Sequence, residues 1–518
     1  MAALALTFFI AAVAAAVILR NQDDDGRQGD RLPPTEARPA TAAEGSLRIG
    51  VPELPATYNP FDIRARNPSA GQILSMVLPQ LFDVTADGEI VGRLVEDASV
   101  VEQGRTVRFT LAEGARWSDG TPITASDLAF TLGVITSAGW PGPDAGYDLL
   151  TSVTGRGRDV TFRFSRRYPA WKRLFSGEDY VLPRHRLDGH DLTSAWAKGP
   201  DIGAGPYLLK GSTPGLNVIL TANAEWWGGG PGVRDLEVVT VPDATTLQHL
   251  FEQGELDVAW MPAFTERIRE MEAIEGAEVD VAAPGGRIVS LYFQTEKVPV
   301  DVRVASLDLV DRDRLTKVLL GGEADLATSW GRLREGGGWP RWYINADLAG
   351  ELDERDMAFA IADEDPMASL VARALQHRAR STPLTFDAVR LPNHLLFGEW
   401  LPQGTFDLVA ATEVQWPDPC WRCRFDSAFA GETNWSRVND IDDLATQADL
   451  GNHEAAADLE LELQRDAVML PLWRPSAVVV TRNVAGVEAS AWAPGPFWRV
   501  ERWETTSDRS VQSTTSSG

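Results

Sequence analysis

Residues 115–128 read ARWSDGTPITASDL, and this stretch decides how the rest of the chain is interpreted. Thr124, followed three residues later by Asp127, is a capping-box start for a helix. Three apolar residues then share one face of that helix: Leu128, Leu132 and Ile135. Just before the stretch, apolar residues alternate with polar ones, which predicts a half-buried strand: Val107, Phe109 and Leu111. Periodicity alone therefore predicts a strand, a turn and a helix, without any function.

The order of motifs around this unit is more informative than the unit itself. Leu-Phe-Asp stands at residues 81–83, an acidic turn at 87–89 and Leu-Val-Glu at 94–96. Together with residues 115–128 this order resembles the family 5 solute-binding proteins of ABC importers, the oligopeptide- and dipeptide-binding proteins. Later matches to the family are Gly-Ala-Gly-Pro-Tyr at 203–207, Asn-Ala-Glu-Trp-Trp at 223–227, Gly-Glu-Leu-Asp at 254–257 and Leu-Pro-Leu at 470–472.

The resemblance implies an α/β fold with two lobes, a hinge between them and an extra subdomain on lobe I, as in the type II periplasmic-binding-protein class. We expect the following division of the chain: a signal or membrane anchor at 1–20, a disordered spacer at 21–45, lobe I at 46–285 with its flanking subdomain at 67–185, lobe II at 286–470, a return to lobe I at 471–506 and a disordered tail at 507–518. The implied partners are a small-molecule or oligopeptide ligand and ABC permease subunits with their ATPase.

Composition agrees with a globular body and excludes two classes of partner. The chain has 518 residues, enough for two or three lobes with sizeable cores. With 48 Lys and Arg against 74 Asp and Glu, its net charge of −26 disfavours extended contact with nucleic acid or an anionic membrane surface. We expect a monomer.

Residues 2–19 are an uncharged apolar run, and at roughly 1.5 Å per residue in a helix they would span about 27 Å, close to the thickness of a bilayer core. The run is either a cleaved signal peptide or an anchor. No basic residue precedes it, and Val17, Ile18 and Leu19 prolong it past the alanines, so we favour an uncleaved anchor. The body is then extracytoplasmic and tethered to the membrane, or secreted or periplasmic if cleavage occurs.

Candidate ligand contacts lie in loops that follow strands. In the resembled family the first strand and its loop touch the ligand, which here implicates Glu53, Leu54, Tyr58 and Asn59. A plain surface turn is the alternative for this loop. Trp260, at the end of a predicted strand, and Gln294, where the family usually has Asn, complete the candidates before residue 300.

The loop after the predicted strand 406–412 resembles the Asp-Tyr-Pro-Asp-Pro loop of the family, whose first acid pairs with the terminal ammonium of a peptide. Here that position is Gln415, so a charge-assisted bond to an ammonium is missing. We expect either a peptide whose ammonium is redirected to Glu413 or Asp418, or a neutral ligand such as an oligosaccharide stacked on an aromatic side chain. The aromatic candidates are Trp260, Trp416 and Trp421. A local cap before Pro419 is the alternative for Asp418.

Cys420 and Cys423 are the only cysteines, and in an exported protein we expect them to form a disulfide that stiffens this loop. A structural zinc site would need four ligands, and a thioredoxin-like role needs a different context, so we expect no metal and no cofactor. The sequence lacks His-Glu-x-x-His and Gly-x-Ser-x-Gly, and we expect no enzymatic activity. An anchored ligand sensor without transport is the alternative function.

Overall fold

The computed structural model describes residues 30–31, 44–55, 57–62, 68–137, 146–241, 243–320, 324–331, 352–363, 365–429, 433–492 and 495–506. The predicted anchor at 1–20 and tail at 507–518 lie outside these ranges. Within the ranges, no helix has the length and apolar character that crossing a membrane requires. The predicted disorder of 21–45 is wrong at two points, because Asp30–Arg31 form strand β1 and strand β2 begins at Glu44. β1 pairs antiparallel with β5 (Val95–Val101), where backbone groups at a sheet edge accept a partner strand whatever its side chains.

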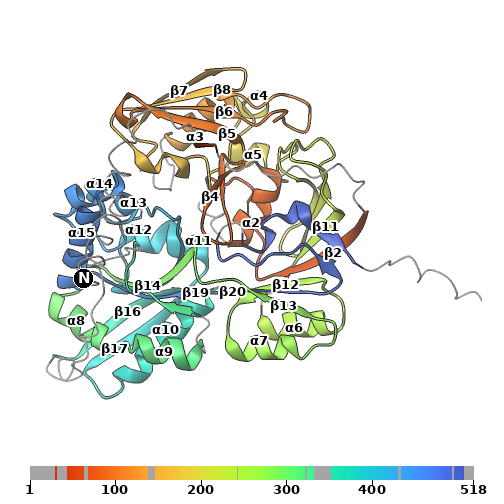
Figure 1. Ribbon diagram of the computed structural model, residues 1–518. Coiled ribbons are helices and arrows are strands. Elements are labelled where there is room, and N and C mark those ends of the chain that lie inside the picture. Colours follow the sequence, from red (N-terminus) through yellow and green to blue (C-terminus); the bar gives the residue numbers. More distant parts are fainter. Residues whose placement is uncertain are drawn as a thin grey trace, which may run out of the picture.

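Lobe I is built on a seven-stranded sheet (Figure 1). Its strands, in spatial order, are β13 (Glu278–Val281), β20 (Ala477–Thr481), β12 (Val258–Pro262), β2 (Glu44–Val51), β11 (Val233–Thr240), β10 (Asn217–Ala222) and β9 (Tyr207–Thr213). Helices α6 (Ala244–Glu252) and α7 (Thr265–Glu272) pack beside β12 and β13. Asp243 caps α6, with its carboxylate accepting from the Thr246 N–H at 2.8 Å.

The flanking subdomain is a five-stranded antiparallel sheet covered by helix α3 (Ala125–Ile135). The strand order is β1, β5, β6 (Thr106–Leu111), β8 (Asp159–Phe164) and β7 (Leu150–Arg156). The predicted capping box is confirmed, because the Thr124 N–H donates to Asp127 Oδ2 at 2.9 Å and the Thr124 hydroxyl accepts from the Ser126 N–H. A small hairpin, β3 (Phe82–Val84) and β4 (Ile90–Gly92), and helix α2 (Pro68–Val77) connect this sheet to lobe I.

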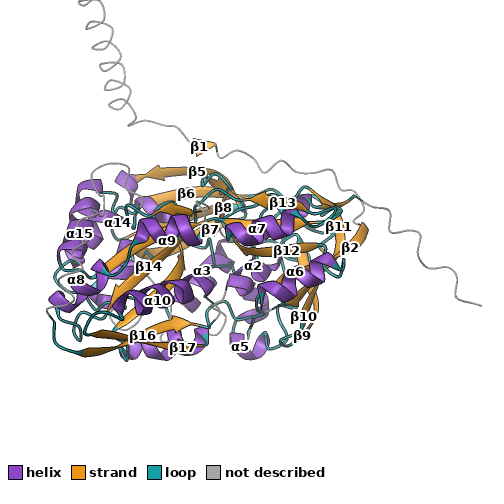
Figure 2. Ribbon diagram, turned by 90° about the horizontal axis from the view of Figure 1, so that it is seen from below, coloured by secondary structure: helices purple, strands orange, loops and turns teal. Residues whose placement is uncertain are grey.

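Lobe II is a six-stranded sheet with helices on its faces (Figure 2). Its strands, in spatial order, are β15 (Ala324–Leu326), β19 (Met469–Pro475), β14 (Arg287–Phe293), β18 (Leu408–Val414), β16 (Arg355–Ala362) and β17 (Leu384–Leu391). Its longer helices are α8 (Val300–Asp308), α9 (Arg312–Leu319), α10 (Pro366–Ala379), α14 (Asp442–Asp449) and α15 (His453–Arg465). Short helices elsewhere in the chain are α4 (Arg184–Leu187), α5 (Leu192–Ala195), α11 (Asn393–Leu395), α12 (Leu401–Gln403) and α13 (Trp421–Phe425), and β21 (Val484–Ala485) pairs with β22 (Glu504–Thr505).

Two segments join the large sheets. Residues 282–286 connect β13 to β14, and Ser476 alone separates β19 from β20, which lie nearly in line across the middle of the molecule (Figure 1). The first connection includes residue 285, the boundary at which we expected lobe I to pass into lobe II. The return to lobe I begins later than expected, because residues 471–475 belong to β19 and pair with β14 and β15 in the lobe II sheet.

Candidate ligand-binding site

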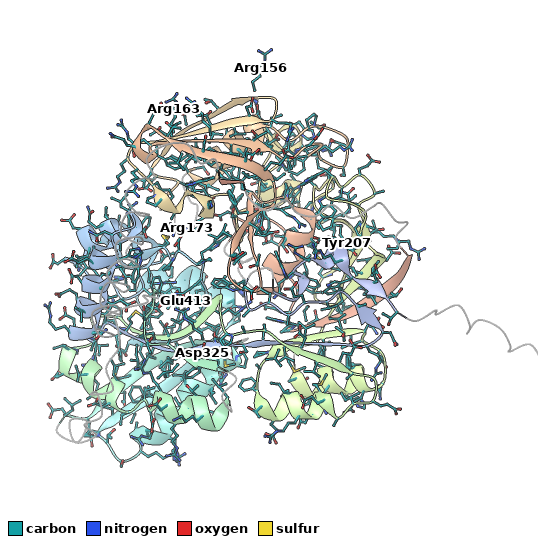
Figure 3. All side chains as sticks on the ribbon, in the orientation of Figure 1. Arg156, Arg163, Arg173, Tyr207, Asp325 and Glu413 are labelled. Atoms are coloured by element: carbon teal, nitrogen blue, oxygen red, sulfur yellow. A yellow bond between two sulfur atoms is a disulfide. The ribbon has the colours of Figure 1, made fainter. Side chains whose placement is uncertain are left out.

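A cavity of about 230 Å³ lies between the flanking subdomain and lobe II. Tyr147 and residues 173–179 form one wall, and Trp330 with residues 413–424 forms the other. In Figure 3, Arg173 lies beneath the flanking sheet, on the side of Glu413, whereas Arg156 and Arg163 point away from the molecule. The cavity thus lies between two parts of the molecule that have separate sheets.

The wall from the flanking subdomain carries a cation whose hydrogen-bonding capacity is only partly used. Arg173 ends the short helical turn Pro169–Arg173, and its Nη2 donates to the Tyr168 hydroxyl at 2.5 Å. Its Nη1 is buried and has no hydrogen-bond partner among the described residues. Burial alone would lower the pKa of Arg173, but Tyr168 and the carboxylates of Asp449 and Asp418 outweigh it and raise that pKa. The guanidinium is therefore charged at every physiological pH.

Two acids lie on the same wall. The Asp179 carboxylate accepts from the Tyr147 hydroxyl at 2.9 Å, and the same hydroxyl accepts from the Phe175 N–H at 2.7 Å. Glu178 is exposed at the rim. This wall consequently has charges of both signs facing the cavity.

The wall from lobe II is a network of ion pairs and hydrogen bonds, in which Arg424 Nε alone of the Arg424 nitrogens is buried without a hydrogen-bond partner among the described residues. Glu413, at the end of β18, forms an ion pair with Arg424 and accepts from the Tyr292 hydroxyl. Trp330 Nε1 also donates to the Tyr292 oxygen, at 2.9 Å, and the Arg424 guanidinium stacks over Trp435 at 3.7 Å. Burial, and then the charge of Glu413, raise the pKa of Tyr292 well above its usual value. Glu413 lies in the cavity wall, and protein groups already hold both of its oxygens.

Gln415 is a neutral side chain placed against a buried cation. Its Oε1 accepts from Arg474 Nη1 at 2.5 Å, and its Nε2 donates to the Trp330 carbonyl at 3.1 Å. Arg474 also donates to the carbonyls of Ser329 and Trp330. A carboxylate at position 415 would pair with Arg474, so this part of the wall does not offer a negative charge to a ligand.

Trp416 closes the cavity against lobe I. Its ring is half-buried and packs on the apolar core shared by lobe I and the flanking subdomain. Gly177 approaches it so closely that an added Cβ would lie 2.5 Å from Trp416 Nε1. Arg422 makes a further contact across the gap, donating from Nη1 to Asp148 Oδ2 at 2.9 Å. The two sides of the cavity are thus in contact in this structure.

The predicted residues of the first loop support that loop and do not line the cavity. Asn59 Nδ2 donates to Thr193 Oγ1 at 2.9 Å, and Asn59 Oδ1 accepts from the Phe61 N–H, as in a local turn. Tyr58 is buried, and burial raises its pKa. Leu54 packs on the lobe I core, and Glu53 Oε1 accepts from Asn393 Nδ2 of lobe II at 3.4 Å. Glu53 therefore links the lobes without reaching the cavity.

Gln294 lies at the wrong end of its strand to contact this cavity. In the antiparallel pairing of β14 with β18, Arg287 is opposite Val414, whereas Phe293 is opposite Leu408. Gln294 follows Phe293 and is buried, with its Oε1 accepting from the Glu296 N–H at 2.7 Å. Strand pairing, which the sequence does not display, separates it from the loop at 413–421.

The remaining aromatic and acidic candidates are mostly structural. Trp260 is buried beneath the Arg287 guanidinium, which lies 5.4 Å from its ring centroid. Trp421 is buried, with its ring 5.0 Å from that of Trp330. Asp418 is exposed and not in the lining, although it acts electrostatically on Arg173. Of the three aromatic candidates, only Trp416 lines the cavity.

The cysteine pair is joined as predicted. Cys420 and Cys423 form a disulfide, and both line the cavity. Cys420 caps α13, with its sulfur accepting from the Cys423 N–H at 3.1 Å. The disulfide closes the turn from which Arg422 and Arg424 project, so it stiffens the lobe II wall.

Several lining residues were missed by the sequence analysis: Tyr147, Arg173, Glu178, Asp179 and Arg424. Arg173 stands in no motif, and nothing in its neighbourhood distinguishes it from the other basic residues of the subdomain. Arg424 follows the recognised loop directly and lies four residues beyond Cys420, so proximity to the cysteine pair was its one available signal.

Two lobes with separate sheets, joined by two short connections and enclosing a cavity, define a solute-binding protein fold. The oligopeptide-binding protein AppA from Bacillus subtilis, solved with a nonapeptide, superposes with a TM-score of 0.78 over 90% of this chain and 100% of that one, at 17% identity. The profile of the bacterial extracellular solute-binding proteins, family 5, matches residues 89–352. The chain belongs to this family.

Curated relatives are similar over a limited region. A binding protein of Brucella melitensis is 27% identical over 263 residues, which are 46% of this chain and 42% of that protein. The oligopeptide-binding protein OppA of Mycobacterium tuberculosis is 28% identical over 225 residues, which are 41% of this chain and 38% of OppA. The chain thus matches about two fifths of the length of these relatives. Proteins of this family bind solutes outside the cytoplasm, and these relatives are binding proteins rather than enzymes.

Proposed function

We propose that this protein captures a peptide-like or other small polar ligand in the cavity between the flanking subdomain and lobe II and delivers it to the permease of an ABC importer. The observation that carries the proposal is the position of the cavity. Its walls come from segments about 150 residues or more apart in sequence, one in the flanking subdomain of lobe I and one in lobe II, and the sheets of the two lobes are joined at 282–286 and Ser476. A ligand held between such walls stabilises their contact.

Closure of the lobes is the proposed signal to the permease. A ligand with higher affinity for the closed than for the open form shifts the population toward closure, and the two connections between the lobes act as the hinge. Trp416 against Gly177 and Arg422 against Asp148 are contacts that closure makes. No bond is made or broken in this cycle.

We assign ligand contact to Glu413, Gln415 and Trp416 among the residues predicted from sequence. The proposal also keeps the extracytoplasmic body as a monomer tethered through residues 1–20, with the permease and its ATPase as partners. Each of these assignments extends what family membership supports.

Small-angle scattering and mass spectrometry test the capture function together. Mass spectrometry of the purified full chain identifies compounds that co-purify, and scattering is measured before and after their removal. We expect the radius of gyration to rise when the ligand is removed and to fall when it is restored. An unchanged radius at saturation with a verified ligand would contradict hinge closure.

A ligand sensor with the same fold is the second candidate. It is favoured by Gln415, whose side-chain oxygen accepts from Arg474. In the peptide-binding relatives described above, an acid at this position pairs with the terminal ammonium of the peptide, and Gln415 supplies no such charge. Genes for a permease and an ATPase beside the gene of this protein would support import, and their absence would support sensing.

A further inference from the structure

We propose that the disulfide of Cys420 and Cys423 is a reversible redox site, and that its reduction by a dithiol loosens the contact between lobe II and the flanking subdomain. The site is separate from ligand recognition, because the change is made in the wall of the cavity and not at the ligand. The inference rests on the proposed closure of the lobes only where it links this contact to opening of the cavity.

The first step is that a reductant can reach the disulfide. Cys420 and Cys423 both line the cavity, and both are half-buried instead of enclosed in the core of lobe II. Glu178 and Val414, which also line the cavity, are exposed, so the cavity has an opening to solvent. Exposed disulfides are the more readily reduced ones, since exchange requires a thiolate to reach one of the two sulfurs.

The second step is that the disulfide holds the short helix α13, which carries Arg422. Cys420 precedes this helix and Cys423 lies within it, and the helix has only 5 residues. A helix of this length is not stable by itself. The crosslink, together with a hydrogen bond from the Trp421 N–H to Asp449 Oδ1 at 2.8 Å, therefore fixes its position.

Arg422 joins the two sides of the gap through two carboxylates. Its Nη1 donates to Asp148 Oδ2 of the flanking subdomain at 2.9 Å, and its Nε donates to Asp426 Oδ2 of lobe II at 3.0 Å. The Arg422 side chain is 10% exposed and that of Asp148 is 30% exposed, so the ion pair is shielded from most of the solvent. Because such a bond depends on distance and angle, a displaced α13 loses its contact with Asp148.

The third step is that the reduced form has a partner for the new thiol. In the disulfide the Cys420 sulfur carries no proton, and it lies 3.7 Å from Asp449 Oδ2. A thiol at this position can donate its S–H to that carboxylate oxygen. Reduction therefore changes the contacts of the same carboxylate that positions the Trp421 N–H at the start of α13.

Electrons and protons balance with a dithiol as the co-reactant. One thiolate of the dithiol attacks a sulfur of the pair and forms a mixed disulfide, and the second thiol of the dithiol then displaces the protein sulfur. The S–S bond of the protein is broken, Cys420 and Cys423 each end as a thiol, and the dithiol is oxidised to its own disulfide. Reoxidation is the same exchange in reverse.

The test measures reduction and opening in the full chain. Dithiothreitol is added to the folded protein, and thiols are alkylated with iodoacetamide and counted by mass spectrometry, which reports this pair alone because the chain has 2 cysteines. Hydrogen exchange over residues 420–426 and the radius of gyration are measured before and after reduction. We expect two alkylated thiols without unfolding, a larger radius, and exchange at least about tenfold faster, which corresponds to about 1.4 kcal/mol of local stability.

Variants show whether the disulfide acts through Arg422. Asp148→Asn removes the charge that Arg422 contacts without altering α13, so it should enlarge the radius of the oxidised form, and reduction should then add little. The double variant Cys420→Ser with Cys423→Ser should have the radius of the reduced form and should not respond to dithiothreitol. Arg184→Gln removes an exposed ion pair of the same subdomain and is the matched control, which should respond as wild type does. Thermal melting shows whether each variant is folded.

Each other outcome contradicts the inference. If dithiothreitol reduces the chain in urea but not in its folded form, the sulfurs are out of reach. Reduction without faster exchange at 420–426, or without a larger radius, shows that the disulfide does not hold the contact. An effect of reduction that adds in full to that of Asp148→Asn shows that it does not act through Arg422.

The radius also separates this inference from the capture function. If removal of a co-purified compound enlarges the radius whereas reduction does not, ligand capture with closure stands and the redox site is overturned. If neither treatment enlarges the radius, hinge closure is overturned together with the redox site.

Discussion

The two walls of the cavity differ in what their charged groups contact. On the lobe II wall, Glu413 and Arg424 neutralise each other and Gln415 is held by Arg474. On the flanking wall, Arg173 donates to the Tyr168 hydroxyl. Each wall also has one buried guanidinium nitrogen without a hydrogen-bond partner among the described residues, Arg173 Nη1 and Arg424 Nε. The comparison teaches that the acid of the lobe II wall has a cation of its own, whereas the cation of the flanking wall has a tyrosine hydroxyl as its hydrogen-bond partner. Substitutions in the lobe II wall are therefore expected to change stability the most.

The largest expected effect comes from breaking the ion pair of the lobe II wall. In Arg424→Met, the buried Glu413 loses its cation, and removing one partner of a buried pair typically costs about 3–5 kcal/mol of the free energy of unfolding. Urea unfolding followed by tryptophan fluorescence measures this loss. The double variant Arg424→Met with Glu413→Gln is expected to recover most of it, because no charge is then left unpaired. A single variant within about 1 kcal/mol of wild type would show that the network is not structural.

A smaller, pH-dependent effect is expected at Glu460, which supports the loop behind the lobe II wall. Its Oε1 accepts from the Ser329 hydroxyl at 2.7 Å and from the Gly331 N–H at 2.9 Å, next to Trp330. Burial raises the pKa of Glu460 from 4.5 to about 7, against the opposing effects of these hydrogen bonds and of Arg474. Between these values the folded state holds a proton that the unfolded state has lost, so this group makes stability fall as pH rises.

The measurement for Glu460 is the difference in unfolding free energy between Glu460→Gln and wild type across pH. The difference should change by about 3 kcal/mol in favour of the variant from pH 4.5 to above pH 7, because the variant carries no titrating group there. Glu462→Gln on the same helix is the control, and its difference from wild type should stay within about 0.5 kcal/mol, since it removes only a surface ion pair. A flat profile for Glu460→Gln would contradict the raised pKa.

The smallest expected effect concerns the contact between the walls. Gly177 has φ +72° and an added Cβ would meet Trp416 Nε1, so Gly177→Ala is expected to cost about 1–2 kcal/mol and to displace Trp416 from lobe I. Gly157→Ala is the matched control, because Gly157 has φ +61° but open space around its Cβ position. Only the first variant should increase the radius of gyration and shift tryptophan emission to longer wavelength. The same response in both variants would mean that the environment of Trp416 does not depend on closure of the two lobes.

Local features of the chain were predictable because they depend on neighbouring residues. The capping box of Thr124 and Asp127 at the start of α3 follows from such a short-range pattern. The disulfide of Cys420 and Cys423 follows from their spacing and from the expected export. The family was also predictable, since its motifs are contiguous stretches of sequence.

Strand register and lobe membership were less accessible. Every residue from Met469 to Thr481 is buried, so buried and exposed residues do not alternate along this segment. No periodicity therefore marks the passage from β19 to β20 at Ser476. Gln294 was placed near the ligand loop because it resembles a family position, but the β14–β18 register takes it to the opposite end of the sheet. A one-dimensional pattern does not state which strand ends meet.

By itself the sequence determined the family and the two-lobed fold class, and it singled out the loop at 413–423, which lines the cavity. Only the tertiary structure decided which charges on that loop are already paired and brought Arg173 to the facing wall. The physical reason is that a hydrogen bond or ion pair depends on distances of about 3 Å between side chains. Between residues as far apart in the chain as Gln415 and Arg474, or Asp148 and Arg422, such distances are set by the packing of whole sheets.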